Sequence, residues 1–337
     1  MIDKDLLKRK IPDLSVIVVC FNQDITVKLI LQSLLDQKTD CEYEIIITDD
    51  GSTPSTFKTV EKIAKNTKAS IKYVWQQDKG IRPTEARNNG IKIAKGKILL
   101  FLDGDMIPDR SLVERHYKAH QKSKHDLLVA GNRLWRGVIN EKNISFVEKN
   151  STQKVLDKLA SGWEIDDESI KRNKFEGKKR VEWLNSKYPW KACFSCNLSV
   201  KKCRYVYFDE NYYGWGNEDW ELAYRLFHKG FKPTYLKDAI AYHLESAPAI
   251  TNAFRTHKQE DIIMNMRNVC YFYDKCPGLN LKDAFFGFIR FELDEKTNKW
   301  SILPRPDSYT TKELRKKVQF IRNWLKKNDI YSAKRKI

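Results

Sequence analysis

The chain has 337 residues, of which 41% are hydrophobic and 31% are charged, a composition typical of a soluble globular protein with a packed core. This composition excludes a disordered chain and a collagen-like repeat. Basic residues outnumber acidic ones by 62 to 44, a net charge of +18 that favours polyanionic surroundings such as nucleic acid, an anionic membrane surface or phosphate-bearing substrates.

The expected compartment follows from what the sequence lacks. No apolar run reaches the roughly 18 to 20 residues that a bilayer-spanning helix needs, and the first ten residues, MIDKDLLKRK, have no apolar signal core. We therefore expect a cytoplasmic protein. Its seven cysteines are an odd number in a long chain, which favours reduced thiols over disulfides, and a zinc site at Cys193 and Cys196 is the less favoured alternative.

The first 130 residues alternate short apolar runs with helical periodicity, which is typical of a parallel sheet covered by helices. We predict strands at 14–20, 43–48, 71–75, 97–102 and 127–130, and then at 193–200 and 239–244. We predict helices along the apolar stripe of 27–35, at 83–96 and at 217–229. The fold class is thus α/β, with a Rossmann-like and mostly parallel sheet.

Two later segments differ from this pattern. Residues 137–191 are less regular and densely charged, so we interpret them as a mobile insertion. Residues 248–337 are predicted to form a basic, helical C-terminal extension.

Carboxylates follow two of the predicted strands. Asp49 and Asp50 end the second strand, and Asp103 and Asp105 end the fourth. Because ligands of an open parallel sheet bind at the carboxyl ends of its strands, we expect these acids on one rim. The Asp103-Gly104-Asp105 spacing suits one hard divalent cation, although such a triplet alone is more often a solvated turn.

A second group of chemically informative residues precedes the predicted helix at 217–229. Tyr213 and Trp215 stand beside glycines, and their faces suit sugar C–H surfaces. Glu218 and Asp219 follow, where acids are also common as helix caps. His243 lies in an apolar segment and either completes a metal site or is an ordinary core histidine.

The order of these motifs resembles the family 2 glycosyltransferases of the GT-A fold. The motifs are SVIVVCFN at 15–22, DDGS at 49–52, ARN at 86–88, DGD at 103–105 and GWGNED at 214–219. The C-terminal part of the matching region, 14–245, resembles the galactosyltransferase-type acceptor region of β-1,4-galactosyltransferases and bacterial chondroitin polymerases. The resemblance implies a catalytic domain at 1–247, with a nucleotide-sugar half at 14–130 and an acceptor half at 192–247.

The resemblance also implies roles for individual residues. It implies that Phe21, Asp50, Arg87 and Asp103 bind the nucleotide sugar. Phe21 stands in place of the tyrosine often found at this position. Binding of Mn²⁺ or Mg²⁺ falls to Asp105, Asp103 and His243. Asp219 is implied as the catalytic base and Glu218 as the acid that orients the acceptor. Trp215 is implied as a sugar-stacking residue, and Tyr213 is grouped with it at the acceptor site.

The implied reaction is an inverting, metal-dependent transfer of a hexose or N-acetylhexosamine from a UDP-sugar to a hydroxyl of a glycan or lipid-linked acceptor. It forms a β-glycosidic bond, as in the synthesis of capsule, lipopolysaccharide or similar surface polysaccharides. Nucleic acid is not an expected partner, since no known nucleic-acid motif appears. The alternatives are a nucleotidyltransferase on a similar sheet and a non-catalytic polyanion- or sugar-binding protein.

The C-terminal segment, residues 312–337, contains ten basic and two acidic residues. Leu314, Val318, Ile321 and Leu325 form a helical apolar stripe within it. Such a helix either lies on an anionic bilayer at the inner face of the plasma membrane or packs on the protein itself. Of these two alternatives, we favour packing of the apolar stripe on the protein.

Overall fold

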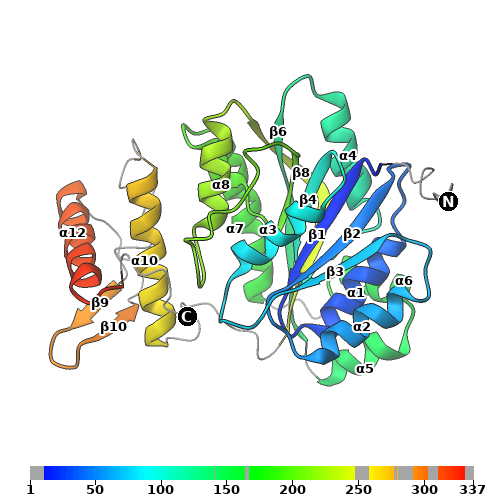
Figure 1. The fold of residues 1–337 in the computed structure, drawn as a ribbon, viewed down its shortest axis with the longest axis horizontal. Coiled ribbons are helices and arrows are strands. Elements are labelled where there is room, and N and C mark those ends of the chain that lie inside the picture. Colours follow the sequence, from blue (N-terminus) through cyan, green and yellow to red (C-terminus); the bar gives the residue numbers. More distant parts are fainter. Residues whose placement is uncertain are drawn as a thin grey trace, which may run out of the picture.

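The computed structural model describes residues 11–139, 141–163, 167–246, 258–276, 279, 291–302 and 310–330. Its centre is an eight-stranded sheet with the order β3-β2-β1-β4-β7-β6-β8-β5 (Figure 1). The strands are β1 (Leu14–Cys20), β2 (Tyr43–Asp49), β3 (Ile71–Trp75), β4 (Ile98–Asp103), β5 (Met106–Pro108), β6 (Leu127–Ile139), β7 (Asn197–Lys201) and β8 (Lys232–Ser246).

Helices cover both faces of this sheet. The helices of the first half are α1 (Asp24–Leu35), α2 (Pro54–Ala64), α3 (Pro83–Ile93) and α4 (Leu112–Lys122). Those that follow β6 are α5 (Glu141–Lys149), α6 (Thr152–Ala160), α7 (Asp167–Leu184), the 3-10 helix η1 (Pro189–Ala192) and α8 (Glu218–Phe227).

The direction of the strands confirms the predicted fold class. β3, β2, β1 and β4 pair in parallel, and β6 pairs in parallel with β8. β7 is antiparallel to both β4 and β6, and β5 is antiparallel to β8, so these two run against the other six. The sheet is therefore mixed but mostly parallel.

The alternation of side chains along the central strands gives the molecule two cores. Ile17 of β1 and Phe101 of β4 point into one core, together with α8 and the C-terminal helices. Val16 and Val18 of β1 point into the other core, with α1 and α4. Both faces of these strands are buried, which explains their uninterrupted apolar sequences.

The structure differs from the predicted elements at several places. β8 begins at Lys232 rather than at residue 239, and α3 ends at Ile93 rather than at residue 96. β6 continues to Ile139 because, after a register shift at Gly131, it pairs with the second half of β8. β7 begins at Asn197 rather than at residue 193, because the Cys193 amide still donates a hydrogen bond to the Trp190 carbonyl of the 3-10 helix η1. β5 was too short to be seen in the sequence pattern, and its pairing with β8 defines it.

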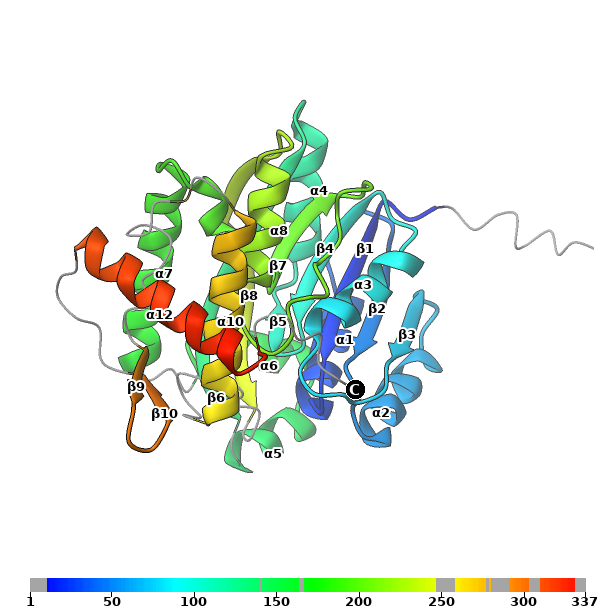
Figure 2. The ribbon, with the colours of Figure 1, turned by 60° about the vertical axis from the view of Figure 1, so that its left-hand side comes forward.

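The segment at 137–191 contains helices α5, α6 and α7, with α7 packed against β6 and β8. Its mobility stays a prediction. The C-terminal region contains the expected helices, α10 (Gln259–Lys275) and α12 (Thr311–Lys327), and an unexpected hairpin of β9 (Phe291–Asp294) and β10 (Lys299–Ile302). Figure 2 shows α12 crossing α10, with α10 beside α8.

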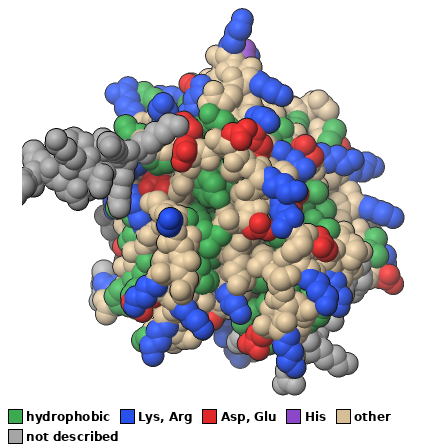
Figure 3. Space-filling view, turned by 90° about the vertical axis from the view of Figure 1, so that its right-hand side faces the viewer, with side chains coloured by type: hydrophobic (Ala, Val, Ile, Leu, Met, Phe, Trp, Pro, Cys, Tyr) green, Lys and Arg blue, Asp and Glu red, His purple; other side chains and the backbone are tan. Residues whose placement is uncertain are grey.

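The apolar stripe of α12 is buried. Leu314, Val318, Ile321 and Leu325 are each at most 3% exposed, and they belong to the same core as α10 and the hairpin. The structure thus favours packing of the stripe on the protein. No helix in the described ranges is long and apolar enough to span a membrane. On the face shown in Figure 3, lysine and arginine side chains are interspersed with acidic ones.

Candidate active site

The ends of β1, β2 and β4 form one edge of the sheet, as the sequence predicts. The strand register sets Cys20 beside Asp49, and Val19 beside Asp103. Gly104 is required between the two aspartates of the β4 loop, because a Cβ there would lie 2.2 Å from Gln23 Oε1 and 2.8 Å from the Val19 carbonyl.

Asp49 and Asp50 have different surroundings. Asp49 Oδ1 accepts hydrogen bonds from the backbone amides of Gly51 (3.0 Å) and Ser52 (2.6 Å), so this carboxylate stabilises the turn. Asp50 accepts from Gln76 Nε2 and from the Arg82 amide, both at 2.6 Å. Burial raises the pKa of Asp50 to about 6.

Phe21 begins the bend that follows β1 and is 40% exposed. The next residue, Asn22, fixes this bend to the end of β2, because its amide donates to Ser52 Oγ at 2.7 Å and its Oδ1 accepts from the Thr53 amide at 2.9 Å. An exposed ring on a well-anchored bend suits stacking against a planar base.

Arg87 of α3 connects the two acidic motifs. Its Nη2 lies 2.7 Å from Asp103 Oδ1 at the end of β4, and its Nη1 lies 3.5 Å from Glu218 Oε1 at the start of α8. The guanidinium is buried and stacks 5.1 Å above the Phe208 ring. Arg87 therefore holds together two acids that are 115 positions apart in the sequence.

Asp105 and His243 form a pair across β5 and β8. His243 Nε2 lies 3.2 Å from Asp105 Oδ2, and the ladder places His243 opposite Met106. Burial would raise the pKa of Asp105, but the nearby charges of His243 and Arg133, together with the hydrogen bond to His243, lower it. Asp105 Oδ1 is buried and has no hydrogen-bond partner among the described residues.

The Asp105 and His243 pair fits a metal ion in part. An orphaned carboxylate oxygen beside an imidazole is a donor set that Mn²⁺ accepts. The described ranges contain no group of three His, Cys, Asp or Glu side chains arranged to hold a metal. Further coordination positions would thus fall to substrate oxygens and water.

The acids of α8 belong to the same site. Burial, followed by the charge of Asp219, raises the pKa of Glu218 to about 7. The Ser195 hydroxyl donates a hydrogen bond to Asp219 Oδ1. Burial raises the pKa of Asp103, and the charges of Asp105 and Asp219 add to this effect, so both acids lie within electrostatic range of Asp103.

The aromatic residues precede these acids in a loop at 209–217. Gly214 and Gly216 both have positive φ, and Trp215 between them is 45% exposed. Asn217 is left-handed (φ 72°) and is the N-cap of α8. Tyr213 faces another part of the molecule, described next.

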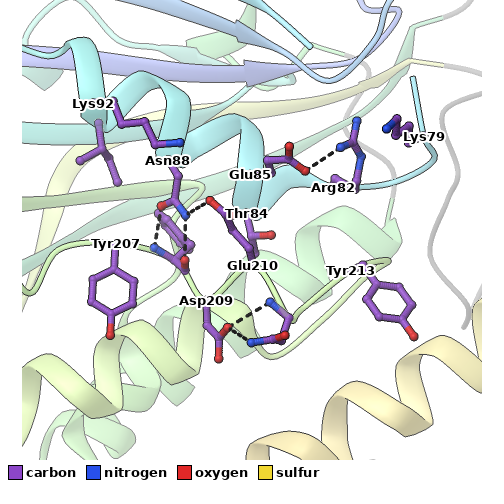
Figure 4. A pocket seen from close by; sticks show the side chains of 13 residues that line it. Lys79, Arg82, Thr84, Glu85, Asn88, Lys92, Tyr207, Asp209, Glu210 and Tyr213 are labelled. Carbon is purple, nitrogen blue, oxygen red and sulfur yellow. Dashed lines mark hydrogen bonds and ion pairs between the residues drawn. The ribbon is translucent and has the colours of Figure 1, made fainter. Parts of the chain in front are cut away.

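A cavity of about 1030 Å³ lies between α3 and the loop at 207–213 (Figure 4). Tyr213 lines it together with Tyr207, Arg82 and Asn88, and Asn88 is held by the Phe208 backbone. None of Asp103, Asp105, Glu218 and Asp219 lines this cavity. The structure therefore places Tyr213 in a cavity that these acids do not line, whereas Trp215, three positions before Glu218 in the sequence, does not line it.

Two residues of the site were missed from the sequence. Ser195 is fully buried at the turn before β7 and contacts Asp219, but a serine in a turn carries no distinguishing signal. Arg133 of β6 lies close enough to Asp105 to affect its pKa and is paired with Glu176 of α7 at 2.8 Å. Only the fold reveals it, because β6 extends beyond its predicted end.

Comparisons with known proteins match this architecture. A model of glycosyl transferase family 2 matches residues 15–177, and a model described as the N-terminal domain of galactosyltransferase matches residues 178–247. These matches confirm the resemblance that the motifs indicate.

Individual relatives are similar over most of this chain. The chondroitin synthase of Escherichia coli is 26% identical over 283 residues, 79% of this chain and 40% of that protein. A GalNAc(5)-diNAcBac-PP-undecaprenol beta-1,3-glucosyltransferase of Campylobacter jejuni is 28% identical over 293 residues, 81% of this chain and 84% of that protein.

The chain spans 24% to 40% of the length of the hyaluronan and chondroitin synthases that it matches. Among solved structures, TarS of S. aureus in complex with UDP-GlcNAc superposes with a TM-score of 0.49 at 18% identity, covering 77% of this chain and 66% of that one.

Proposed function

We propose, on the premise that residues 15–177 match the model of glycosyl transferase family 2, that the chain transfers a hexose or N-acetylhexosamine from a UDP-sugar to a hydroxyl group of a glycan or glycoconjugate acceptor. The observation that carries the proposal is the Arg87 bridge between Asp103 and Glu218. It joins the acids of the β4 loop to the acids of α8, as a site with a donor half and an acceptor half requires.

The donor half consists of the edge formed by β1, β2 and β4. Phe21 would stack on the nucleotide base, and Asp50 would accept a hydrogen bond from the base or the ribose. Arg87 would keep Asp103 oriented. The basic side chain of Arg133, close to Asp105, would offset the charge of the diphosphate.

Asp105 and His243 would hold a divalent cation, and Asp103, which pairs with Arg87, would reach it through water. The orphaned Asp105 Oδ1 supports this assignment. When bound, Mn²⁺ or Mg²⁺ supplies Lewis-acid stabilisation of negative charge on the diphosphate.

The acceptor half consists of Trp215, Glu218 and Asp219. The acceptor oxygen attacks the anomeric carbon of the donor, a new β-glycosidic bond forms, and the bond to the diphosphate breaks with its electron pair. Asp219 takes the acceptor proton, while Ser195 holds its Oδ1. Glu218 accepts a hydrogen bond from the acceptor and orients it. A positioned general base contributes on the order of 10²–10⁴-fold.

The acceptor class is proposed from the relatives. The Campylobacter protein is named for a polyprenol-linked acceptor, and the synthases for polysaccharides. A lipid-linked glycan of a surface polysaccharide would suit both. Contact with an anionic bilayer would then depend on the basic residues of α12, because its apolar stripe is buried.

A screen of UDP-sugars tests the proposed function. Each sugar nucleotide is incubated with the protein and Mn²⁺, and release of UDP is measured with EDTA as the control. The expected result is cation-dependent release from one or two donors. Thermal stabilisation by the same donors checks binding independently, since a ligand of the native state raises the melting temperature. The proposal would be contradicted if no UDP-sugar released UDP and none stabilised the protein.

A further inference from the structure

Helix α10 (259–275) lies outside both family segments, which end at residue 247. It nevertheless packs along the loop at 209–217, which we name the acceptor loop because it carries Trp215 and leads into Glu218 and Asp219. Figure 2 shows α10 beside α8.

Three side chains of α10 bond to backbone carbonyls of the acceptor loop. Asn268 Nδ2 donates to the Tyr213 carbonyl at 2.9 Å, and Asn265 Nδ2 donates to the Trp215 carbonyl at 3.1 Å. Arg267 Nη1 donates to the carbonyl of Asn211. Asn265 and Asn268 are at most 4% exposed. The loop is neither helix nor strand, so these side chains supply partners that secondary structure would otherwise give.

The two glycines of the loop fit against the same helix. A Cβ on Gly214 would lie 2.2 Å from Met264 Cγ, and a Cβ on Gly216 would lie 2.8 Å from Asn265 Nδ2. Both glycines also have positive φ, at 73° and 107°. The Gly-Trp-Gly sequence thus lets the backbone approach α10 while the indole of Trp215 points outward.

The base of the loop is fixed by α10 as well. Tyr271 OH and Lys275 Nζ bond to Asp209 Oδ2 at 2.8 and 2.6 Å. Lys275 also pairs with Glu221 of α8 at 2.9 Å. Helix α10 therefore contacts the acceptor loop at its beginning and along its length, and it also contacts α8, which follows the loop.

We propose that Asn265 and Asn268 are positioning residues, which fix the acceptor loop so that Trp215 and the first turn of α8 face the acceptor. This inference rests on the proposed glycosyl transfer. It makes α10 part of the catalytic unit, although the helix contributes no group to the reacting atoms.

The test uses the full chain with Asn265→Ala and Asn268→Ala, and the near-isosteric Asn268→Asp in case an alanine variant folds poorly. Glu260→Ala, on an exposed position of α10, is the matched control. Hydrogen exchange of amides 213–219 measures how firmly the loop is held. Kinetics with varied acceptor, and calorimetric titration of the donor, separate the two halves of the site.

In the asparagine variants we expect loop exchange to accelerate and kcat/KM for the acceptor to fall by about tenfold, the equivalent of one lost hydrogen bond. Donor affinity should stay within about twofold, because the side chains of Asn265 and Asn268 bond to the acceptor loop and not to the residues of the donor half. The Glu260→Ala protein should match wild type in all three measurements.

Unchanged loop exchange would overturn the inference. A lower melting temperature with wild-type acceptor kinetics would also overturn it, since the asparagines would then be structural only. Failure of the proposed function would look different: the wild-type protein itself would show no transfer, whatever the state of the loop.

Discussion

Ser195 donates a hydrogen bond to Asp219 Oδ1, although the two residues come from different elements. Ser195 lies in the turn between η1 and β7, and Asp219 lies in the first turn of α8. A hydroxyl that donates to one carboxylate oxygen fixes the plane of the carboxyl group. In the proposed mechanism, this directs Asp219 Oδ2 toward the acceptor.

Ser195→Ala should slow transfer by about 10 to 100-fold, because a hydrogen bond to a charged group is worth about 1.5–3 kcal/mol. Donor affinity should not change. Steady-state kinetics with varied acceptor and varied donor check this. The exposed Ser161→Ala is the control. Equal losses in donor and acceptor parameters would argue against a role through Asp219.

Asp105→Asn should lose cation-dependent donor binding, because an amide oxygen is a weaker ligand for a hard cation than a carboxylate. Calorimetric titration of UDP-sugar with and without Mn²⁺ measures the effect. We expect Mn²⁺ to strengthen donor binding in the wild-type protein and to have little effect in the variant. A variant that responds to Mn²⁺ like wild type would exclude Asp105 as a ligand.

Arg87→Met should destabilise the fold by about 3–5 kcal/mol, because it removes a buried cation that pairs with the buried Glu218 and with the partly exposed Asp103. Urea unfolding at pH 7 gives the free energy. The matched control is Arg110→Met, which removes a surface pair with Asp36 and should cost below about 1 kcal/mol. If the free energy of unfolding fell as little in Arg87→Met as in Arg110→Met, the Arg87 bridge would not be structurally important.

The pH dependence of transfer should report Glu218, whose pKa is raised to about 7 by burial and by Asp219. As an acceptor of hydrogen bonds Glu218 must be ionised, so kcat/KM should rise as pH increases through 7. Glu218→Gln should remove this rise, whereas the exposed Glu61→Gln should keep it. An unchanged pH profile in Glu218→Gln would assign the ionisation to another group.

The same shift has the opposite effect on stability. Because the pKa of Glu218 in the folded protein lies above its ordinary value of 4.5, the folded state binds more protons than the unfolded state between about pH 4.5 and 7. The contribution of Glu218 to the free energy of unfolding should therefore fall as pH rises through this window. Urea unfolding of wild type and Glu218→Gln at pH 5 and pH 7 measures it.

Much of the sheet could be predicted because its strands are buried on both faces. β1 matches its predicted range, since the uninterrupted apolar run LSVIVVC is typical of a strand in a parallel sheet. β3 also matches its predicted range, although it is an edge strand and is only partly buried. β5 and the second half of β6 depend on pairing with β8, which is distant in the chain. A local pattern contains no information about such pairings.

The residues of the candidate site also fall into those that the sequence predicts and those that only the fold reveals. The acids could be found because they follow strands or open a helix, where residue type and position together are informative. Ser195 and Arg133 could not, because their importance comes only from what the fold brings next to them. The asparagines of α10 are a third case, since nothing in their own segment suggests a contact with residues 213–215.

The central claim is that Asp219 acts across a shared site from the donor, and it is tested most directly by Asp219→Asn. Transfer rate and donor affinity are measured on the same preparation, with the donor identified by the UDP-sugar screen. We predict donor binding close to wild type and transfer reduced by about 10²–10⁴-fold. Turnover near the wild-type rate would remove Asp219 from the role of base and contradict the mechanism proposed for this site.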